Sequence, residues 1–150
     1  MKSFLFAGVC ALALVSAIPA SAKMWTDYAP QKGYWEITYV KVDPNKIDDY
    51  LTGLKSVWVP GEELAKKKGL IDDYQVMVSA TPLSGGANVI LCEHHMSFAG
   101  MDPDKARDQA MEKEMEASIP KTKSDAAVAG FDKYRSFVGD DIYVPVDFTK

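Results

Sequence analysis

The topology of this chain follows from residues 34–44, which read YWEITYVKVDP. The first nine residues are mostly aromatic or β-branched, a composition typical of a β-strand. Asp43 can cap the helix that follows, and Pro44 suits a first helical position, where no amide donor is required. The stretch therefore predicts a strand that passes directly into a helix.

The predicted strand has two faces, because successive side chains of a strand point to opposite sides. One face carries Trp35, Ile37 and Tyr39. The other carries Glu36, Thr38, Val40 and Val42. We expect the aromatic face to lie beneath the helices.

After this strand the apolar residues follow a helical period. They are Ile47, Tyr50, Leu51, Leu54, Val57 and Trp58. Pro60-Gly61 is expected to interrupt the helix, and Gly69 to end a short helical turn over residues 62–68. Two strands are predicted next, within residues 70–80 and 88–98, joined by a turn at 81–86 as an antiparallel hairpin.

The last third of the chain predicts helices and then a strand. Asp102-Pro103 starts a helix that runs to about residue 118. Ser124 can cap a further helix, which the helical spacing of apolar residues carries to Val138. From residue 142 to 149 the apolar residues alternate with others, and Pro145 places this last strand at a sheet edge.

The element order, strand-helix-strand-strand-helix-strand, is the ferredoxin-like βαββαβ arrangement of the α+β class. Right-handed crossovers place the helices on one face of a four-stranded antiparallel sheet, with the first and third strands central. Residues 33–150 are expected to form this single domain, after a leader at residues 23–32.

The N-terminal residues 1–22 have the pattern of a cleaved signal peptide. Lys2 precedes an apolar run over residues 4–18, and Ala20-Ser21-Ala22 is a small-residue cleavage site. We therefore expect export, to the periplasm or alternatively to the medium, with a mature chain that starts at Lys23. No second apolar run approaches the length of a membrane span, so no membrane partner is expected after cleavage.

Charge and cysteine content restrict the remaining possibilities. The net charge of the whole chain is −4, and the loss of Lys2 takes it to about −5, which argues against nucleic acid as a partner. Cys10 leaves with the signal peptide, so Cys92 has no partner for an internal disulfide. Cys92 is either a small buried hydrophobic residue or a reactive thiol.

Several short segments resemble a known family. They are residues 33–36 (GYWE), 48–51 (DDYL), Trp58, 65–71 (AKKKGLI) and Tyr134-Arg135. Together they are similar to small exported bacterial proteins of the dimeric α/β-barrel superfamily. The resemblance implies two ferredoxin-like protomers joined sheet to sheet. The superfamily includes cofactor-free monooxygenases, haem-degrading enzymes, lactone isomerases and members without a known reaction, and no catalytic pattern of a named branch matches this chain.

The residues themselves also favour a homodimer. Helices can cover only one face of the expected sheet. The other would carry Thr38, Val40 and Val42 with Val89 and Leu91, a mostly apolar set. A twofold contact between two copies would bury that face.

His94 is the first candidate for chemistry. We expect it on the aromatic face, in a pocket between sheet and helices with Trp35, Tyr39 and Trp58 as walls. An imidazole there is suited to proton transfer at neutral pH, and aromatic walls suit a flat apolar ligand. The alternative is a core histidine bonded to a neighbour, with the aromatic residues as ordinary core.

Glu36, Glu93 and His95 are the second candidate, because all three would share the opposite face, inside the dimer barrel. Carboxylates beside an imidazole can bind a divalent metal or share a proton, whereas a hydrogen-bonded network at the dimer seam is the alternative. No further ligands are evident, so no metal and no cofactor are expected.

The sequence thus favours an exported homodimer that binds a small apolar ligand between sheet and helices, with cofactor-independent oxygenase or isomerase chemistry as an extension. A non-catalytic structural or stress-related dimer, and a haem-binding or haem-degrading protein, are the alternatives.

Overall fold

The computed structural model describes residues 22–81 and 86–149. The expected signal peptide, apart from Ala22, and residues 82–85 of the expected hairpin turn lie outside the described residues. No helix within the described part of the chain is both long enough and apolar enough to cross a membrane.

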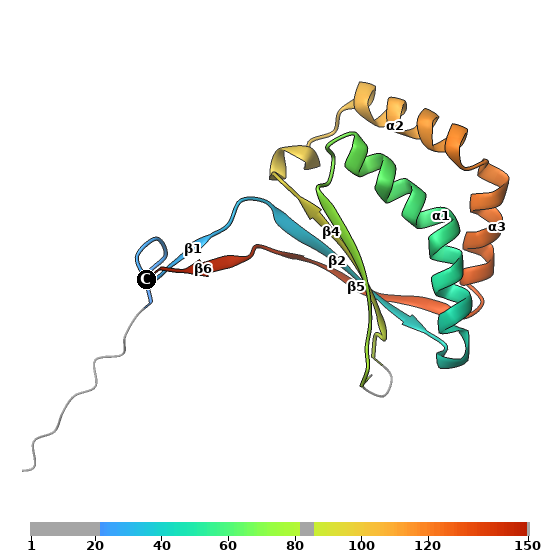
Figure 1. The fold of residues 1–150 in the computed structure, drawn as a ribbon, viewed down its shortest axis with the longest axis horizontal. Coiled ribbons are helices and arrows are strands. Elements are labelled where there is room, and N and C mark those ends of the chain that lie inside the picture. Colours follow the sequence, from blue (N-terminus) through green and yellow to red (C-terminus); the bar gives the residue numbers. More distant parts are fainter. Residues whose placement is uncertain (1–21, 82–85, 150) are drawn as a thin grey trace, which may run out of the picture.

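The main sheet has four antiparallel strands in the order β3-β4-β2-β5 (Figure 1). They are β2 (Tyr34–Val42), β3 (Asp73–Val78), β4 (Val89–His95) and β5 (Arg135–Tyr143). The first and third strands of the expected fold, β2 and β4, lie at the centre, as predicted. This strand order with antiparallel pairing confirms the ferredoxin-like α+β fold.

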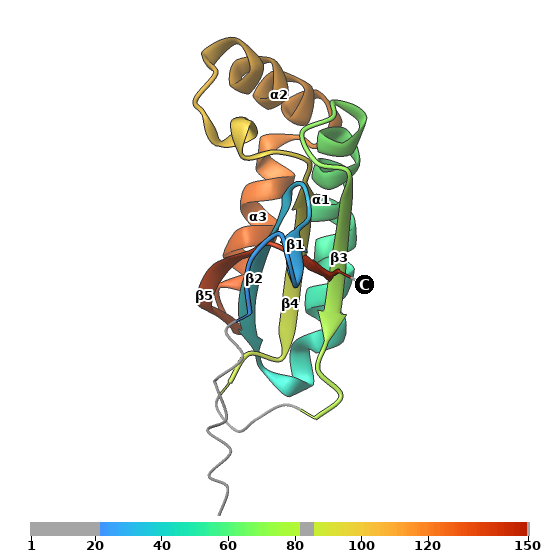
Figure 2. The same cartoon turned by 90° about the vertical axis from the view of Figure 1, so that its left-hand side faces the viewer.

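The helices are α1 (Ile47–Lys67), α2 (Lys105–Ser118) and α3 (Lys121–Phe131), with short 3-10 turns at Pro44–Lys46 and Phe98–Met101. Figure 1 shows α1 and α3 side by side against one face of the sheet, while α2 lies beyond the end of the sheet. None of the helices in residues 22–81 and 86–149 lies on the opposite face (Figure 2).

The beginning of α1 follows the sequence prediction and its middle does not. The Asp43 carboxylate accepts a hydrogen bond from the Asn45 amide at 2.9 Å and caps the 3-10 turn before the helix. The expected interruption at Pro60-Gly61 is wrong, because α1 is continuous through Pro60 to Lys67. Proline removes one helical hydrogen bond, and the burial of the apolar face of α1 outweighs that cost.

The helices of the second half differ from their predicted bounds. The start predicted at Asp102-Pro103 is wrong, because α2 begins at Lys105, whereas α3 begins at Lys121, before the predicted cap Ser124. The cap of α2 is Asp104, whose carboxylate accepts hydrogen bonds from the Ala106 and Arg107 amides at 3.0 Å. The helix expected up to Val138 is wrong, because α3 ends at Phe131 and the chain enters β5 at Arg135. Residues 135–143 form a strand because they pair with residues 35–42 of β2. The local spacing of apolar residues does not reveal that pairing.

The two ends of the domain form a separate arm. The expected leader contains β1 (Tyr28–Pro30), which pairs with β6 (Val146–Phe148) in a two-stranded sheet. Pro145 separates β6 from the edge strand β5. Figures 1 and 2 show this arm leaving the body on the side of the sheet away from the helices.

The core lies between the sheet and α1 and α3. Its buried residues are Val40, Val42, Tyr50, Leu54, Val57, Val89, Leu91, Ile119 and Phe131. Because Val40, Val42, Val89 and Leu91 belong to it, the helices cover the face of β2 that carries Glu36 and Thr38. The expectation that the face of Trp35, Ile37 and Tyr39 lies beneath the helices is therefore wrong. Compact β-branched side chains let the helices approach the sheet closely, and the aromatic side chains occupy the uncovered face.

Candidate functional site

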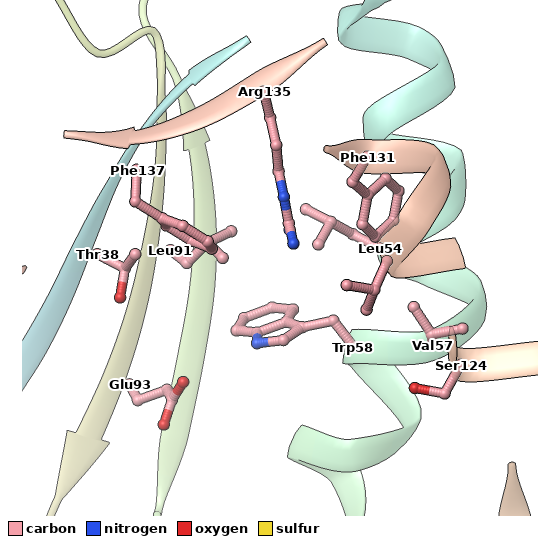
Figure 3. A pocket seen from close by; sticks show the side chains of 11 residues that line it. Thr38, Leu54, Val57, Trp58, Leu91, Glu93, Ser124, Phe131, Arg135 and Phe137 are labelled. Atoms are coloured by element: carbon pink, nitrogen blue, oxygen red, sulfur yellow. The ribbon is translucent and has the colours of Figure 1, made fainter. Parts of the chain in front are cut away.

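A cleft of about 320 Å³ lies between the sheet and the helices α1 and α3 (Figure 3). Its walls are mostly apolar and aromatic. They comprise Thr38, Leu54, Val57, Trp58, Leu91, Glu93, Ser124, Val128, Phe131, Arg135 and Phe137. An apolar concave lining with a few polar groups is typical of small-molecule sites.

Helical spacing brings the wall residues of α1 onto one face. Leu54, Val57 and Trp58 are three and four residues apart, so they form one stripe that faces the sheet. The Trp58 ring also meets Tyr74 of β3 edge-on, with centroids 5.5 Å apart. This contact fixes the indole on the floor of the cleft in the view of Figure 3.

The wall from α3 is positioned by close helix packing. Phe131 contacts Tyr50 of α1 edge-on, with centroids 5.0 Å apart. Gly53 makes this approach possible, because a Cβ there would overlap the Phe131 ring. Glycine inside a helix costs stability, so its place in α1 is explained by the room it leaves for Phe131.

Arg135 introduces a positive charge into the apolar cleft. Its side chain is 11% exposed and enters the cavity from the start of β5 (Figure 3). The guanidinium carbon lies 4.8 Å from the ring centroids of both Phe131 and Phe137. Aromatic faces on both sides favour the cation through their quadrupoles.

Carboxyl groups gather beyond the Trp58 end of the cleft. Glu36 and Glu93 are paired across β2 and β4, and Glu62 of α1 lies one turn after Trp58 on the buried face of the helix. Burial, followed by the charges of Glu93 and Glu36, raises the pKa of Glu62 to about 8. Burial and the charge of Glu36 also raise the pKa of Glu93. Glu62 is therefore mostly neutral at pH 7 and holds a proton beside the cleft.

His95 completes this group. Its ring stacks on Tyr34 with centroids 4.6 Å apart, and its Nε2 atom lies 3.6 Å from a Glu36 oxygen and 3.9 Å from a Glu93 oxygen. Those separations are too long for hydrogen bonds, and Nε2 is buried without a partner in the described part of the chain. The predicted set of Glu36, Glu93 and His95 thus lies together, on the same face as Val40 and Val42. The expectation that this face meets a second copy is wrong, because the helices cover it.

His94 lies on the uncovered face. Its Nδ1 is 2.5 Å from a carboxylate oxygen of Asp72, and its ring contacts Trp35 with centroids 4.9 Å apart. Its placement beneath the helices was wrong, because the helices cover the other face of the sheet, the one that carries Glu93 and His95. An acid/base role for His94 stays a hypothesis, now tied to the open face and to Asp72.

The expected pocket of Trp35, Tyr39 and Trp58 is divided by the sheet. Trp58 lines the cleft, whereas Trp35 and Tyr39 lie on the uncovered face, where the Tyr39 hydroxyl is 2.9 Å from the Tyr143 hydroxyl. Cys92 is on that face too and is buried, which raises the pKa of its thiol. This pKa shift disfavours the thiolate.

Two residues of the site were missed by the sequence reasoning. Glu62 continues the apolar stripe of α1 at helical spacing from Trp58, and a charged residue in that stripe was a usable indication. Arg135 was assigned to a helix, so its orientation into the cleft could not be inferred. Among residues 22–81 and 86–149, no group of three or more His, Cys, Asp or Glu side chains is arranged to hold a metal ion.

Comparisons with other proteins identify similar structures and no family. No protein-family model matches the chain, and no curated protein matches it significantly in sequence.

Three solved structures illustrate the similarity. A dimeric ferredoxin-like protein from an uncultured marine organism is 9% identical, with 80% of this chain and 91% of that chain covered and a TM-score of 0.47. HapK from Hahella chejuensis is 9% identical, with 73% and 89% covered and a TM-score of 0.44. A dimeric protein of unknown function and ferredoxin-like fold from Bacteroides fragilis is 14% identical, with 80% and 99% covered and a TM-score of 0.40. The ferredoxin-like fold of this chain follows from its own strand order and pairing.

Proposed function

We propose that this protein binds a small, largely apolar molecule in the cleft between the sheet and the helices α1 and α3. The observation that carries the proposal is the cavity of about 320 Å³, whose walls are mostly apolar and aromatic. Its volume falls in the range of small-molecule sites, which begins at about 300 Å³.

Proton transfer within the cleft is an extension of this proposal. Glu93 lines the cavity and its pKa is raised, and Glu62, whose pKa is raised to about 8, lies beside it. A carboxyl with the pKa of Glu62 can exchange a proton near neutral pH. This favours cofactor-independent proton chemistry, as in an isomerase or oxygenase, with Glu93 as the group in contact with the ligand.

A pair of identical substitutions tests the binding proposal. Thr38 points into the cleft from β2 (Figure 3), whereas Thr52 is exposed on α1. Native mass spectrometry of the mature protein, purified gently and then incubated with the neutral bicyclic probe 2-naphthamide, should show a non-covalent adduct for the wild type and Thr52→Phe. Thr38→Phe, which fills the cleft, should lose it. An unliganded wild type at saturating probe concentration would favour the rival class, a non-catalytic structural dimer.

We further propose that the chain acts as a homodimer through the uncovered face of its sheet. That face carries Trp35, Ile37, Tyr39, Met77, Ile90 and Tyr143. Met77 and Tyr143 are 44% and 46% exposed. An apolar sheet face of this kind is usually covered, and a twofold axis lets two identical faces cover each other.

Export is proposed from the sequence pattern of residues 1–22. The intact mass of the protein from a periplasmic fraction should correspond to a chain that starts at Lys23. A full-length mass in the cytoplasmic fraction would contradict it.

A further inference from the structure

We propose that the cleft selects apolar molecules that carry one carboxylate group, and that Arg135 pairs with this carboxylate. The inference deepens the proposed function and rests on it, since it names the chemical class of the ligand in the same cleft.

Arg135 carries a positive charge into the apolar cleft. The Arg135 side chain reaches into the cavity between the aromatic rings of Phe131 and Phe137 (Figure 3). It is only 11% exposed, so water cannot solvate most of the guanidinium. A charge that has lost its hydration needs charged or hydrogen-bonding partners to offset the cost.

Among the residues that the structure describes, few such partners lie near Arg135. Nη1 lies 3.5 Å from the Tyr50 hydroxyl, at the limit of a hydrogen bond, and Nη2 lies 3.7 Å from a carboxylate oxygen of Asp132. The Asp132 side chain is 65% exposed, so water screens that charge. The Nε atom is buried and has no hydrogen-bond partner within the described ranges. A guanidinium has five N–H donors, and most of those of Arg135 are available to bind an acceptor on a ligand.

The cation–π contacts of Arg135 do not provide hydrogen-bond acceptors for these N–H groups. The guanidinium carbon lies over the rings of Phe131 and Phe137, 4.8 Å from each centroid, and the ring quadrupoles stabilise the cation there. The N–H bonds lie in the plane of the group and point to its edge. The cation–π contacts therefore leave these N–H donors without a strong acceptor, and a carboxylate fits the edge of a guanidinium with two parallel hydrogen bonds.

The carboxyl cluster beside the cleft sets the orientation of the ligand and limits it to one negative charge. Glu93 lines the cavity, and its pKa is raised by burial and by the charge of Glu36. A second anionic group on the ligand would face these carboxyls and be disfavoured. The apolar body of the ligand can then lie along Leu54, Val57 and Trp58, with its single carboxylate at Arg135.

Two probes of the same shape test this inference. The carboxylate of 2-naphthoate is ionised at pH 7, whereas 2-naphthamide is neutral and nearly isosteric. Isothermal titration calorimetry on the wild-type protein should give about tenfold tighter binding of naphthoate, the size expected for a charge-assisted hydrogen-bonded pair.

Substitutions at Arg135 test whether this residue causes the preference for naphthoate over naphthamide. Arg135→Met keeps an apolar side chain between the two rings and should bind both probes equally. Arg135→Lys keeps the charge but loses the paired donors, and should retain part of the preference. The matched control is Lys133→Met, which removes one exposed positive charge two residues away and should keep the full preference.

The outcomes separate this inference from the proposed function. Equal binding of both probes to the wild type overturns the role of Arg135 and leaves apolar binding intact. A preference that Lys133→Met removes as fully as Arg135→Met overturns it too, since it would reflect overall charge. Failure of both probes to bind overturns the proposed function as well. If Arg135→Met does not fold by circular dichroism, the wild-type comparison and Arg135→Lys still decide the question.

Discussion

Glu36 and Glu93 are directly opposed across the two central strands, and both side chains point to the face that α1 covers. Like charges at directly opposite positions destabilise a sheet. The helix adds to the cost, because α1 directs Glu62 to the same place, where it is only 9% exposed. Burial and the charges of Glu93 and Glu36 raise the pKa of Glu62, so a proton on Glu62 relieves the repulsion at this place.

The stability of the protein should therefore fall as the pH rises. The pKa of Glu62 is about 8 in the folded protein, against 4.5 for an ordinary glutamate. Between these values the folded state holds a proton that the unfolded state has released, so stability is lost through this window, at up to about 1.4 kcal/mol for each pH unit.

Glu62→Gln should remove most of this dependence. Urea unfolding at about pH 4 should give equal stabilities for the variant and the wild type, and at about pH 9 the variant should be more stable by roughly 2 kcal/mol or more. Glu112→Gln, an exposed position on α2, is the control and should follow the wild type. A variant as pH-dependent as the wild type would show that Glu62 is not the group concerned.

Gly53 and Gly130 should respond in opposite ways to alanine. Alanine is better than glycine in a helix by roughly 1 kcal/mol, but a Cβ at Gly53 would overlap the Phe131 ring, whereas nothing lies near one at Gly130. Gly53→Ala should destabilise the protein by about 1–2 kcal/mol in spite of its helix propensity. Gly130→Ala, near the end of α3, should stabilise it by about 0.5 kcal/mol. Thermal denaturation followed by circular dichroism distinguishes the two signs, and equal shifts would contradict the packing of α1 on α3.

Asn88 links two strand ends through its buried side chain. Its Oδ1 accepts a hydrogen bond from the Val42 amide, and its Nδ2 donates one to the Val42 carbonyl, both at 2.8 Å. Asn88→Ala would leave two buried backbone groups without partners, which costs about 2–4 kcal/mol. Asn45→Ala, at an exposed position, serves as a control with little expected change. If urea unfolding gives the two variants the same stability, Asn88 does not bridge the strands.

The sequence predicts the strands of the sheet better than it predicts which face of the sheet the helices cover. Alternation along residues 34–42 correctly separates Trp35, Ile37 and Tyr39 from Thr38, Val40 and Val42, but both sets are apolar. Period alone does not say which set the helices cover. The aromatic set looked like core, and the structure places the β-branched set there. Because the covered face is the opposite of the one predicted, His94 lies away from the cleft, whereas Glu93 and His95 lie on the side of the helices.

Long-range pairing explains the other differences. Residues 131–138 have apolar side chains at helical spacing, so local pattern favoured a helix, yet Arg135 to Phe137 pair with β2 some ninety residues earlier. Such non-local pairing is set by the whole sheet and not by the segment. As a result Arg135, the charged group of the cleft, was placed on the wrong element, whereas Trp58 belongs to the strongly periodic α1 and lines the cleft.

The uncovered sheet face provides the last prediction. Ile37 lies at the centre of β2, between Cys92 of β4 and Asp141 of β5, and points away from the helices. If two copies associate through this face, Ile37→Arg would place two buried charges at their contact, a cost of several kcal/mol. Sedimentation velocity should show a dimer for the wild type and for the control Ala117→Arg, an exposed position on α2, and a folded monomer for Ile37→Arg. A wild-type monomer, or an Ile37→Arg dimer, would mean that this face does not hold two copies together. Because the cleft lies on the opposite side of the sheet, the Ile37→Arg monomer should still bind 2-naphthamide, which separates assembly from ligand binding.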